Sequence, residues 1–485
     1  MSSAIVIIGF VAVNYLDVGE YYIASSPEDN GIGQDRKNTE WDELEQQDEE
    51  RTAHEQEANP TSGFITLAAL AQQEKQVTLT AMLTDNSGGN PSNDQRERLF
   101  QPAMQELRAK HPDIDIKINY IQSPYNKTRA DMLAAFADRT PVDIILLDQI
   151  WLGEFAERGY LTDLTDRAKQ WGGLSDWYQA NLDGNVYKGK VYGIWAWTDV
   201  RGIWYWEDLL NKAQVDPNSL KTWDGYISST NKLSQALKDQ GIQGTVLNNA
   251  NYSPDLWYPY LWMLGGEIIV PKDGHPTKGN YWFPAYNSSE GVKALEFIKE
   301  QVSAGIKPVK GLTDEPFVDR KTAVYITGSW LPGWFPINQW SSLPQRMGFI
   351  PAFPVPAGTN QSSTMMGGWE LAIPQTGQNK ELAWELLTIM LEPKIISPWL
   401  EQNGFLPTQM TLGSGPQSAQ LNQTIPFYNK MITMFPTAHS RPSIAEYPQI
   451  AENVREAIEN VYYGIKEPKQ ALDDAAAKSA KALGW

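Results

Sequence analysis

The chain has 485 residues, no cysteine and a formal net charge of −18. The missing cysteines exclude disulfides, thiolate metal sites, a cysteine nucleophile and a lipid-modified cysteine. The acidic balance argues against nucleic acid or an anionic membrane surface as the main partner, and the length indicates more than one domain.

The amino terminus combines an apolar stretch with a long acidic one. Residues 4–13 (AIVIIGFVAV) are apolar throughout, but they are shorter than the roughly 20 residues of a spanning helix. They also lack the basic start of a signal peptide. Residues 24–63 are too polar and acidic to bury a core. We expect residues 1–23 to act as a membrane anchor, with a buried strand or helix as the alternative, and residues 24–76 to form a flexible acidic tether.

Strands and helices alternate from residue 77 onward. Residues 77–83, 114–121 and 142–148 read as strands, and the last of these is continuously apolar, as in a buried parallel sheet. Residues 95–111 and 125–140 between them have helical character. This β-α-β-α-β order predicts an α/β fold with a parallel sheet.

Ligands of parallel sheets bind at the carboxyl ends of the strands. Asp148 directly follows the third strand, and Asn86 and Ser87 follow the first. These residues are therefore candidates for ligand contact. For Asp148, the alternative is that its carboxylate only caps the helix that starts near Trp151.

Several sequences resemble catalytic motifs without meeting their requirements. Residues 184–190 (GNVYKGK) fit the spacing of a phosphate-binding loop, but Val191 replaces the Ser or Thr that such loops need. We expect a β-turn there. The four histidines are far apart, which argues against a histidine-based metal site, and no G-x-S-x-G nucleophile motif occurs. The sequence therefore indicates no catalytic residue, no metal and no cofactor, although carboxylates are too numerous to exclude a glycosidase pair.

Residues 193–206 (GIWAWTDVRGIWYW) contain four tryptophans, one Asp and one Arg. On strands, Trp195 and Trp197 would share one face, and Trp204 and Trp206 would share another. We expect Asp199 and Arg201 at a turn between two strands. Trp197, Asp199 and also Trp195 would line a polyol-binding cleft, since an indole can stack on a sugar ring while a carboxylate accepts hydrogen bonds from hydroxyls. The alternative is that these indoles are packed core.

A second block follows, from about residue 199 to 367. Helices are expected at residues 222–240 and 290–305, and a strand at residues 322–328. Residues 380–391, 450–465 and 470–483 also read as helices. Residues 252–266 are rich in Trp, Tyr and Pro and fit neither pattern.

Six segments in order together resemble the extracellular sugar-binding proteins of ABC transporters, the class that includes maltose- and trehalose/maltose-binding proteins, and the resemblance covers roughly residues 77–485. The segments are VDIILLDQIWLGEFAERGYLTDLT, YKGKVYGIWAWTDVRGIWYWEDLLNKA, FVDRKTAVYITGSW, GGWELAIPQTGQNKELAWELLTIML, NGFLPTQ and RPSIAEYPQIAENVREAI. In the second segment, Trp195 stands where the family commonly has a proline.

The resemblance implies a set of ligand-binding residues. These are Asp148, Trp197, Asp199, Trp330, Gly367, Gly368, Trp369 and Arg441, with Asn86 and Ser87 from the first loop. Trp330 would be a stacking plate, and the double glycine would allow a close backbone approach. The alternatives are core packing for Trp330 and Trp369, a salt bridge within one lobe for Arg441, and a plain turn for the two glycines.

The resemblance also implies a two-lobed fold with three crossings between the lobes. Lobe 1 would comprise residues 77–197 and 370–404, and lobe 2 would comprise residues 199–366 and 407–485. A di- or oligosaccharide would bind in the cleft by hinge closure and pass to the ABC transporter permease subunits. The chain would be a monomer outside the cytoplasm, touching the membrane only through its amino terminus. The alternatives to a sugar-binding transport protein are a glycosidase and a receptor for another solute, such as a peptide or glycerol phosphate.

Overall fold

The computed structural model describes residues 75–85, 94–249, 253–274, 282–311, 314–359 and 361–485. All of them belong to the compact unit formed by Gln73–Trp485. The expected anchor, almost all of the expected tether, and Asn86 and Ser87 lie outside the described residues. Within those residues, no helix has the length and apolar character needed to cross a bilayer.

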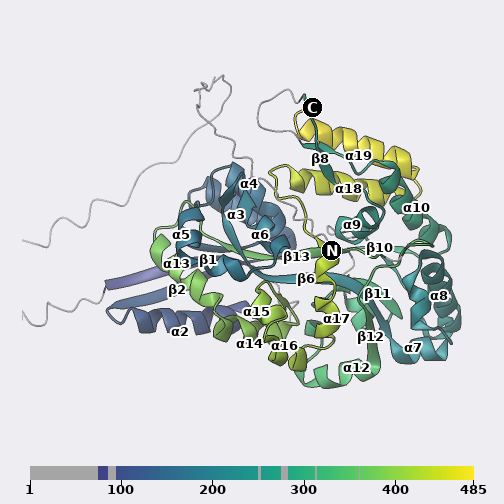
Figure 1. Cartoon of the computed structure of the whole chain (residues 1–485), viewed down its shortest axis with the longest axis horizontal. Helices are drawn as coiled ribbons and strands as arrows, with labels where there is room; N and C mark the ends of the chain where they lie inside the picture. The colour runs from purple at the N-terminus through teal and green to yellow at the C-terminus, as the bar shows by residue number, and fades with distance from the viewer. Residues whose placement is uncertain (1–74, 86–93, 250–252, 275–281, 312–313, 360) are drawn as a thin grey trace, which may run out of the picture. The chain divides into compact units, whose positions relative to one another are not determined.

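Three parallel strands form the first part of the structure. β1 (Lys75–Asp85) lies between β2 (Ile114–Pro124) and β3 (Ile144–Asp148) and pairs parallel with both. The connecting helices are η2 (Arg96–Phe100), α2 (Gln101–Lys110) and α3 (Tyr125–Ala137). Figure 1 shows α3 above these strands and α2 below them. The predicted β-α-β-α-β order is confirmed, and all five residues of β3 are buried as its apolar sequence requires.

Short helices and a hairpin lead from β3 to the next long strand. They are η3 (Gln149–Trp151), α4 (Leu152–Glu157), α5 (Thr165–Trp171), η4 (Gly173–Asp176), α6 (Gln179–Gly184), β4 (Val186–Tyr187) and β5 (Lys190–Val191). The turn between β4 and β5 places Lys188 at φ 46° and Gly189 at φ 77°. Two residues of positive φ suit a two-residue hairpin turn. The expected β-turn at the phosphate-loop look-alike is therefore confirmed.

The long strand β6 (Gly193–Trp206) connects two parts of a mixed sheet. Its first half pairs antiparallel with β13 (Thr364–Ala372) and β14 (Leu406–Pro407), and its second half with β11 (Val324–Gly328) and β12 (Met347–Ile350). The expected turn at Asp199 and Arg201 is wrong, because the strand continues through both residues. The pairing with β13 shifts register between Trp369 and Glu370, opposite Trp195–Trp197, which marks a β-bulge.

The remaining elements lie mostly around the second half of β6. Up to β12 they are α7 (Glu207–Lys212), η5 (Pro217–Lys221), α8 (Trp223–Ala236), η6 (Lys238–Gln240), β7 (Leu247–Asn249), α9 (Ser253–Met263), β8 (Ile269–Pro271), β9 (Trp282–Pro284), α10 (Ser289–Ser303), β10 (Pro308–Lys310), α11 (Glu315–Val318), η7 (Leu331–Trp334), η8 (Ile337–Ser342) and α12 (Leu343–Arg346). After β13 they are α13 (Lys380–Met390), α14 (Pro393–Asn403), α15 (Met410–Gly413), α16 (Ser418–Thr424), α17 (Tyr428–Ile432), η9 (Phe435–Thr437), β15 (Ala438–His439), α18 (Tyr447–Tyr462) and α19 (Pro468–Ala482). The Trp/Tyr/Pro-rich stretch forms α9, with Pro259 inside the helix.

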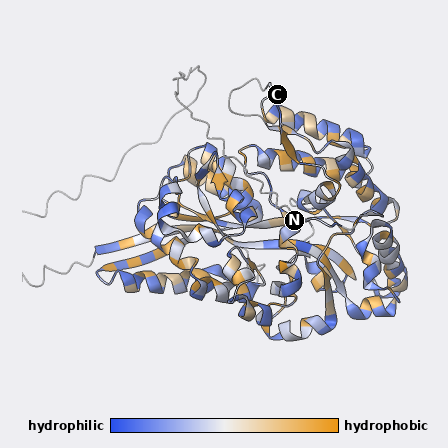
Figure 2. Ribbon diagram, in the orientation of Figure 1, coloured by the Kyte–Doolittle hydropathy of each residue, from blue (hydrophilic) through white to orange (hydrophobic). Residues whose placement is uncertain are grey.

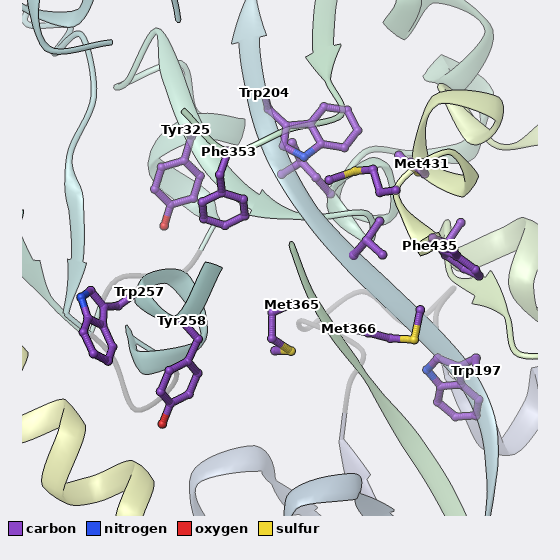
Figure 3. Close-up of a cluster of buried hydrophobic side chains, with 14 of the residues drawn as sticks. Trp197, Trp204, Trp257, Tyr258, Tyr325, Phe353, Met365, Met366, Met431 and Phe435 are labelled. Carbon is purple, nitrogen blue, oxygen red and sulfur yellow. The ribbon is translucent and has the colours of Figure 1, made fainter. Parts of the chain in front are cut away.

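The core of this part is rich in aromatic side chains. Figure 2 shows that the helices carry both hydrophilic and hydrophobic residues, as expected when one face of a helix packs on the sheet. Trp197 and Trp204 are 0% exposed and extend from the same strand β6 (Figure 3). Trp204 packs on Phe349 with ring centroids 4.5 Å apart, and Trp206 stacks on Phe317. These indoles therefore stabilise the sheet.

Candidate functional site

Asp148 ends strand β3 and makes three hydrogen bonds. Its Oδ1 accepts from the backbone N–H of Ile150 at 3.3 Å, which caps η3, and from Nη2 of Arg441 at 2.9 Å. Its Oδ2 accepts from the Tyr125 hydroxyl at 2.9 Å. The capping alternative is therefore confirmed for this carboxylate, and its contact with a ligand stays a prediction. Tyr125 begins α3, so the first part of the sheet supplies both groups.

Arg441 connects this carboxylate to a second one. Its Nη1 donates to Oδ2 of Asp255 at 3.1 Å while its Nη2 donates to Asp148. Asp255 lies in α9, which packs against β13 and α18. Arg441 therefore does form a salt bridge with Asp255, which lies in the same expected lobe, and it also forms a second one with Asp148 of the other expected lobe.

The chain of charges continues to β6. Nη2 of Arg201 is 3.4 Å from the same Asp255 oxygen, and its Nη1 donates to Oδ1 of Asp199 at 2.6 Å. Arg201 also lies 3.4 Å from the Met365 carbonyl oxygen through Nη1. We call the three aspartates and two arginines (Asp148, Asp199, Arg201, Asp255, Arg441) the ion chain.

The ion chain is almost completely buried. No member is more than 7% exposed. Burial raises the pKa of Asp199 and of Asp255 above the ordinary aspartate value, and the two arginines oppose this rise. Burial disfavours the charged form of Arg441, but the nearby Asp148 and Asp255 carboxylates hold its pKa above the ordinary arginine value. Each charge is therefore stabilised mainly by its partners, because burial shields these side chains from solvent.

One partly exposed tryptophan lies on the Arg201 side. Trp330 donates its indole N–H to Oδ2 of Asp314 at 2.6 Å, and Oδ1 of Asp314 accepts from the Thr327 hydroxyl at 2.6 Å. The Arg201 guanidinium lies 5.1 Å from the Trp330 ring centroid, within cation–π range. Burial raises the pKa of Asp314, and its hydrogen bonds oppose the rise. Asp314 thus fixes the orientation of this indole.

A second partly exposed tryptophan lies on the Asp148 side. Trp369 in β13 pairs across the sheet with Asp148. Its ring meets Tyr125 edge-on at 6.0 Å, and it meets Trp151 edge-on at 6.5 Å. Tyr125 in turn stacks on Trp151 at 5.7 Å. The ion chain therefore runs between two aromatic side chains that are not fully buried.

The double glycine allows backbone and side chains to approach closely. A Cβ on Gly367 would lie 2.9 Å from Oδ1 of Asp199 and 3.1 Å from Nη1 of Arg201. A Cβ on Gly368 would lie 1.8 Å from Nε1 of Trp195. Both glycines lie inside strand β13, so the alternative of a plain turn is wrong.

The structure does not bring all predicted residues together. Trp197 is 0% exposed, stacks on Phe405 at 5.5 Å and meets Trp399 edge-on, so it belongs to the core. Trp195 is also 0% exposed. The expectation that these two indoles line a cleft is wrong, because neither of them has any accessible surface.

Sequence reasoning left Tyr125, Asp255 and Asp314 out of the site. The partner of each lies at least 13 residues away along the chain, so local sequence does not reveal it. The proline-flanked Asp255 in the Trp/Tyr/Pro-rich stretch was the strongest available signal, since an acidic residue among large apolar side chains needs a buried partner.

An internal cavity lies elsewhere. It measures about 40 Å³ and is lined by side chains of α8, α9, α10, β7, β11 and α18, among them Tyr226, Tyr260 and Tyr462. This volume suits one or two water molecules, whereas pockets for small ligands measure roughly 300–1,000 Å³. The ion chain and its two tryptophans therefore remain the candidate site.

The chemistry of this candidate site is that of recognition. Carboxylates accept hydrogen bonds, guanidinium groups donate them, and indole rings offer apolar faces. The two indoles come from opposite sides of β6, since Trp369 lies in β13 and Trp330 follows β11, and Asp199 and Arg201 lie in β6 itself. A polar molecule with many hydroxyl groups and apolar C–H faces would find partners in each of them.

Comparison with known proteins agrees with this geometry. A putative binding protein of Brucella abortus is 24% identical over 78% of this chain and 88% of its own length. The arabinooligosaccharide-binding protein of Bacillus subtilis is 21% identical over 79% of this chain and 89% of its own. A solute-binding protein of Thermotoga lettingae, solved with α-D-tagatose, superposes with a TM-score of 0.71 at 22% identity, covering 84% of this chain and 100% of that chain.

The structural likeness confirms the predicted two-lobed α/β fold. Residues 91–395, more than half of the chain, match the sequence profile of the family described as bacterial extracellular solute-binding protein. The chain therefore belongs to the bacterial extracellular solute-binding proteins.

Proposed function

We propose that the chain captures a sugar, a di- or oligosaccharide, at the ion chain and delivers it to the permease of an ABC transporter. Members of its family bind solutes outside the cytoplasm, so the chain is a binding protein and not an enzyme. The glycosidase alternative is set aside on that ground. The arabinooligosaccharide-binding relative and the tagatose-bound neighbour support a carbohydrate ligand.

One observation carries this proposal above all. Buried carboxylates and guanidinium groups contact one another in series, from Arg201 beside Trp330 to Asp148, which pairs across the sheet with Trp369. Both tryptophans keep part of their surface accessible. Sugar hydroxyls can replace the partners within the ion chain, and the two indoles can stack on sugar rings at either end. Asp148, Asp199, Arg441, Trp330 and Trp369 are the proposed contact residues.

The proposal includes the two lobes that would enclose the ligand. We propose lobe 1 as residues 77–197 and 370–404, and lobe 2 as residues 199–366 and 407–485. The proposed boundary on β6 falls at Thr198, three residues before the pairing partner changes from β13 at Val200 to β11 at Arg201. Asp148 lies in proposed lobe 1 and Trp369 directly precedes its second segment, while Arg201, Asp255 and Arg441 come from proposed lobe 2. A ligand that contacts both sets would favour the closed form.

The same proposal includes the cellular setting. The family places the chain outside the cytoplasm. We propose that residues 1–23 anchor it to the membrane, that residues 24–76 act as a tether, and that the body works as a monomer.

Titration with a panel of mono-, di- and oligosaccharides tests the proposal. Intrinsic tryptophan fluorescence and calorimetry would follow binding, and chromatography would check that the sugar is unchanged. We expect saturable binding of one saccharide class by the native chain, with affinity reduced at least 10-fold in Trp369→Ala, since that change removes an aromatic contact. This loss corresponds to about 1.4 kcal/mol.

The panel also contains amino acids, short peptides and glycerol phosphate. Saturable binding of one of these, with none of any saccharide, would overturn the sugar proposal. Trp171→Ala is a matched control, because Trp171 packs against Trp177 and Trp384 away from the ion chain. Its affinity should equal that of the native chain.

A further inference from the structure

Residues 441–444 (Arg-Pro-Ser-Ile), which we call the strap, make contacts on two sides. The strap lies between β15 and α18, both of which belong to proposed lobe 2. β15 pairs with Thr364 and Met365 at the start of β13. Arg441 also contacts Asp255 of α9. Its chain neighbours therefore attach the strap firmly to proposed lobe 2.

The strap nevertheless binds to residues of proposed lobe 1. Gln149, which is 0% exposed, donates from Nε2 to the Ser443 hydroxyl at 2.7 Å and lies 3.4 Å from the Arg441 carbonyl oxygen. The Ser443 hydroxyl lies 3.4 Å from the Gly184 carbonyl oxygen. These contacts fix the backbone of the strap beside Asp148, which the Arg441 side chain then reaches.

A glycine forms the closest part of this contact. A Cβ on Gly153 would lie 2.6 Å from the Ile444 carbonyl carbon and 2.8 Å from its oxygen. Gly153 is inside helix α4, where glycine costs roughly 1 kcal/mol relative to alanine. Gly153 is not among the described residues that have a positive φ, so the helix itself does not require glycine. The contact with Ile444 gives a physical reason for this residue.

We propose that the strap is a latch that holds the two lobes together before any ligand arrives, with Gln149 and Gly153 as its seat. Gln149 is then a positioning residue for Arg441, because it fixes the strap from which that guanidinium extends. The latch raises the population of the closed form in the free protein. The inference extends the proposed function and rests on its two-lobe division, but it does not depend on the identity of the ligand.

The latch has a measurable consequence for affinity. When only a fraction of the protein is in the binding-competent form, the apparent dissociation constant rises by the inverse of that fraction. Weakening the seat should therefore populate the open form and weaken ligand binding. We expect Gly153→Ala to raise the dissociation constant about 10-fold.

A distance measurement on the ligand-free chain tests the proposal directly. The chain has no cysteine, so Lys117→Cys and Lys238→Cys would accept spin labels at two exposed positions only, one in each proposed lobe. Pulsed dipolar spectroscopy would report the distance distribution without any sugar. We expect one dominant short distance in the labelled chain, and a second, longer population when Gly153→Ala is added.

Helix propensity makes the opposite prediction for this substitution. If Gly153 were an ordinary helical residue, alanine would leave the distance distribution unchanged and stabilise the fold by up to about 1 kcal/mol. The latch proposal would be overturned if Gly153→Ala left the distance distribution unchanged and unfolded at a urea concentration at least as high as the native chain does.

A second substitution keeps the test valid if Gly153→Ala unfolds. Ser443→Ala removes the acceptor of Gln149 without adding bulk, and we expect the same longer population at a smaller amplitude. Ser228→Ala is the matched control, because Ser228 is exposed in α8 and contacts only the Gly225 carbonyl oxygen of its own helix. Equal distributions in the two serine variants would also overturn the latch. Because no ligand is present, these outcomes are independent of whether the chain binds sugar.

Discussion

Trp197 and Asp199 are two residues apart on β6, yet their environments differ completely. Trp197 is surrounded by Trp399 and Phe405 and belongs to the core. Asp199 accepts a hydrogen bond from Arg201 and contributes to the ion chain. The dense indoles therefore mark where the sheet is packed, and the charged residues among them mark the candidate site.

The difference has a physical cause. Burial of an indole ring stabilises the folded state and requires no particular arrangement of partners, so neighbouring rings are sufficient. A buried carboxylate needs a cation or several donors, which have to come from particular positions on other elements. The ion chain collects its members from β3, β6, α9 and the strap, so it is sensitive to how those elements are placed.

The largest effect should follow from removing one of the two arginines of the ion chain. Arg441→Met would leave Asp148 and Asp255 buried without this guanidinium, and we expect the free energy of unfolding to fall by about 3–5 kcal/mol. Saccharide affinity should be lost in the fraction that folds. Urea unfolding and calorimetry measure the two effects.

Arg455→Met is the control for this change. Arg455 pairs with Glu452 and Glu459 along α18, and its side chain is 21% exposed. Pairs of this kind contribute up to about 1 kcal/mol. Equal destabilisation by the two variants would contradict the special role of the ion chain.

Trp197 and Trp369 allow the core and the candidate site to be compared with the same substitution. Trp197→Ala should lower the free energy of unfolding by about 3–5 kcal/mol, because it opens a cavity in the core. Its saccharide affinity should stay within about 3-fold of the native value where the chain is folded. Trp369→Ala should cost less, because the ring is only partly buried and its edge-on aromatic contacts add about 1 kcal/mol to that burial.

Binding should show the reverse order, with Trp369→Ala at least about 10-fold weaker than the native chain and Trp197→Ala within about 3-fold of it. If Trp197→Ala lost affinity as strongly while remaining folded, our assignment of Trp197 to the core would be wrong.

The sequence predicts what depends on local pattern. The β-α-β-α-β order and Asp148 at the end of its strand follow from residue spacing alone. Asp255 could not be found in this way, since its partners Arg201 and Arg441 are 54 and 186 residues away. The prediction of a turn at Asp199 and Arg201 was wrong for the same reason. Charged residues in an apolar run suggest a turn unless distant partners allow the strand to continue in the core.

The pH dependence of stability depends on a buried carboxyl group next to the candidate site, that of Glu370, which follows Trp369 in β13. Glu370 is 0% exposed, and neither of its carboxylate oxygens has a hydrogen-bond partner among the described residues. Burial raises its pKa well above 4.5; Asp148 adds to the rise and Arg441 opposes it. As the pH rises above 4.5, the unfolded chain releases this proton while the folded chain keeps it. The folded state then binds more protons, so stability falls with rising pH.

Glu370→Gln removes this dependence. We expect the variant to gain stability relative to the native chain between pH 5 and pH 8, as measured by urea unfolding at several pH values. Glu381→Gln is the control, because Glu381 is exposed and its hydrogen bond with Arg167 lowers its pKa, which reverses the sign. A constant difference between Glu370→Gln and the native chain across this range would contradict a raised pKa in the fold.

The smallest effect is expected at Asp314, which orients Trp330. In Asp314→Asn, the amide oxygen can still accept from the Trp330 indole N–H, and the amide group can donate to the Thr327 hydroxyl. Saccharide affinity should therefore fall no more than about 3-fold. Asp314→Leu has a similar size but no acceptor, so it leaves the indole N–H unpaired, at about 1–3 kcal/mol. The indole nitrogen chemical shift of Trp330 reports this difference without a ligand. If both variants bound saccharide like the native chain while that shift moved in Asp314→Leu, Trp330 would be a structural residue, and the contacts at the Arg201 end would come from charged groups alone.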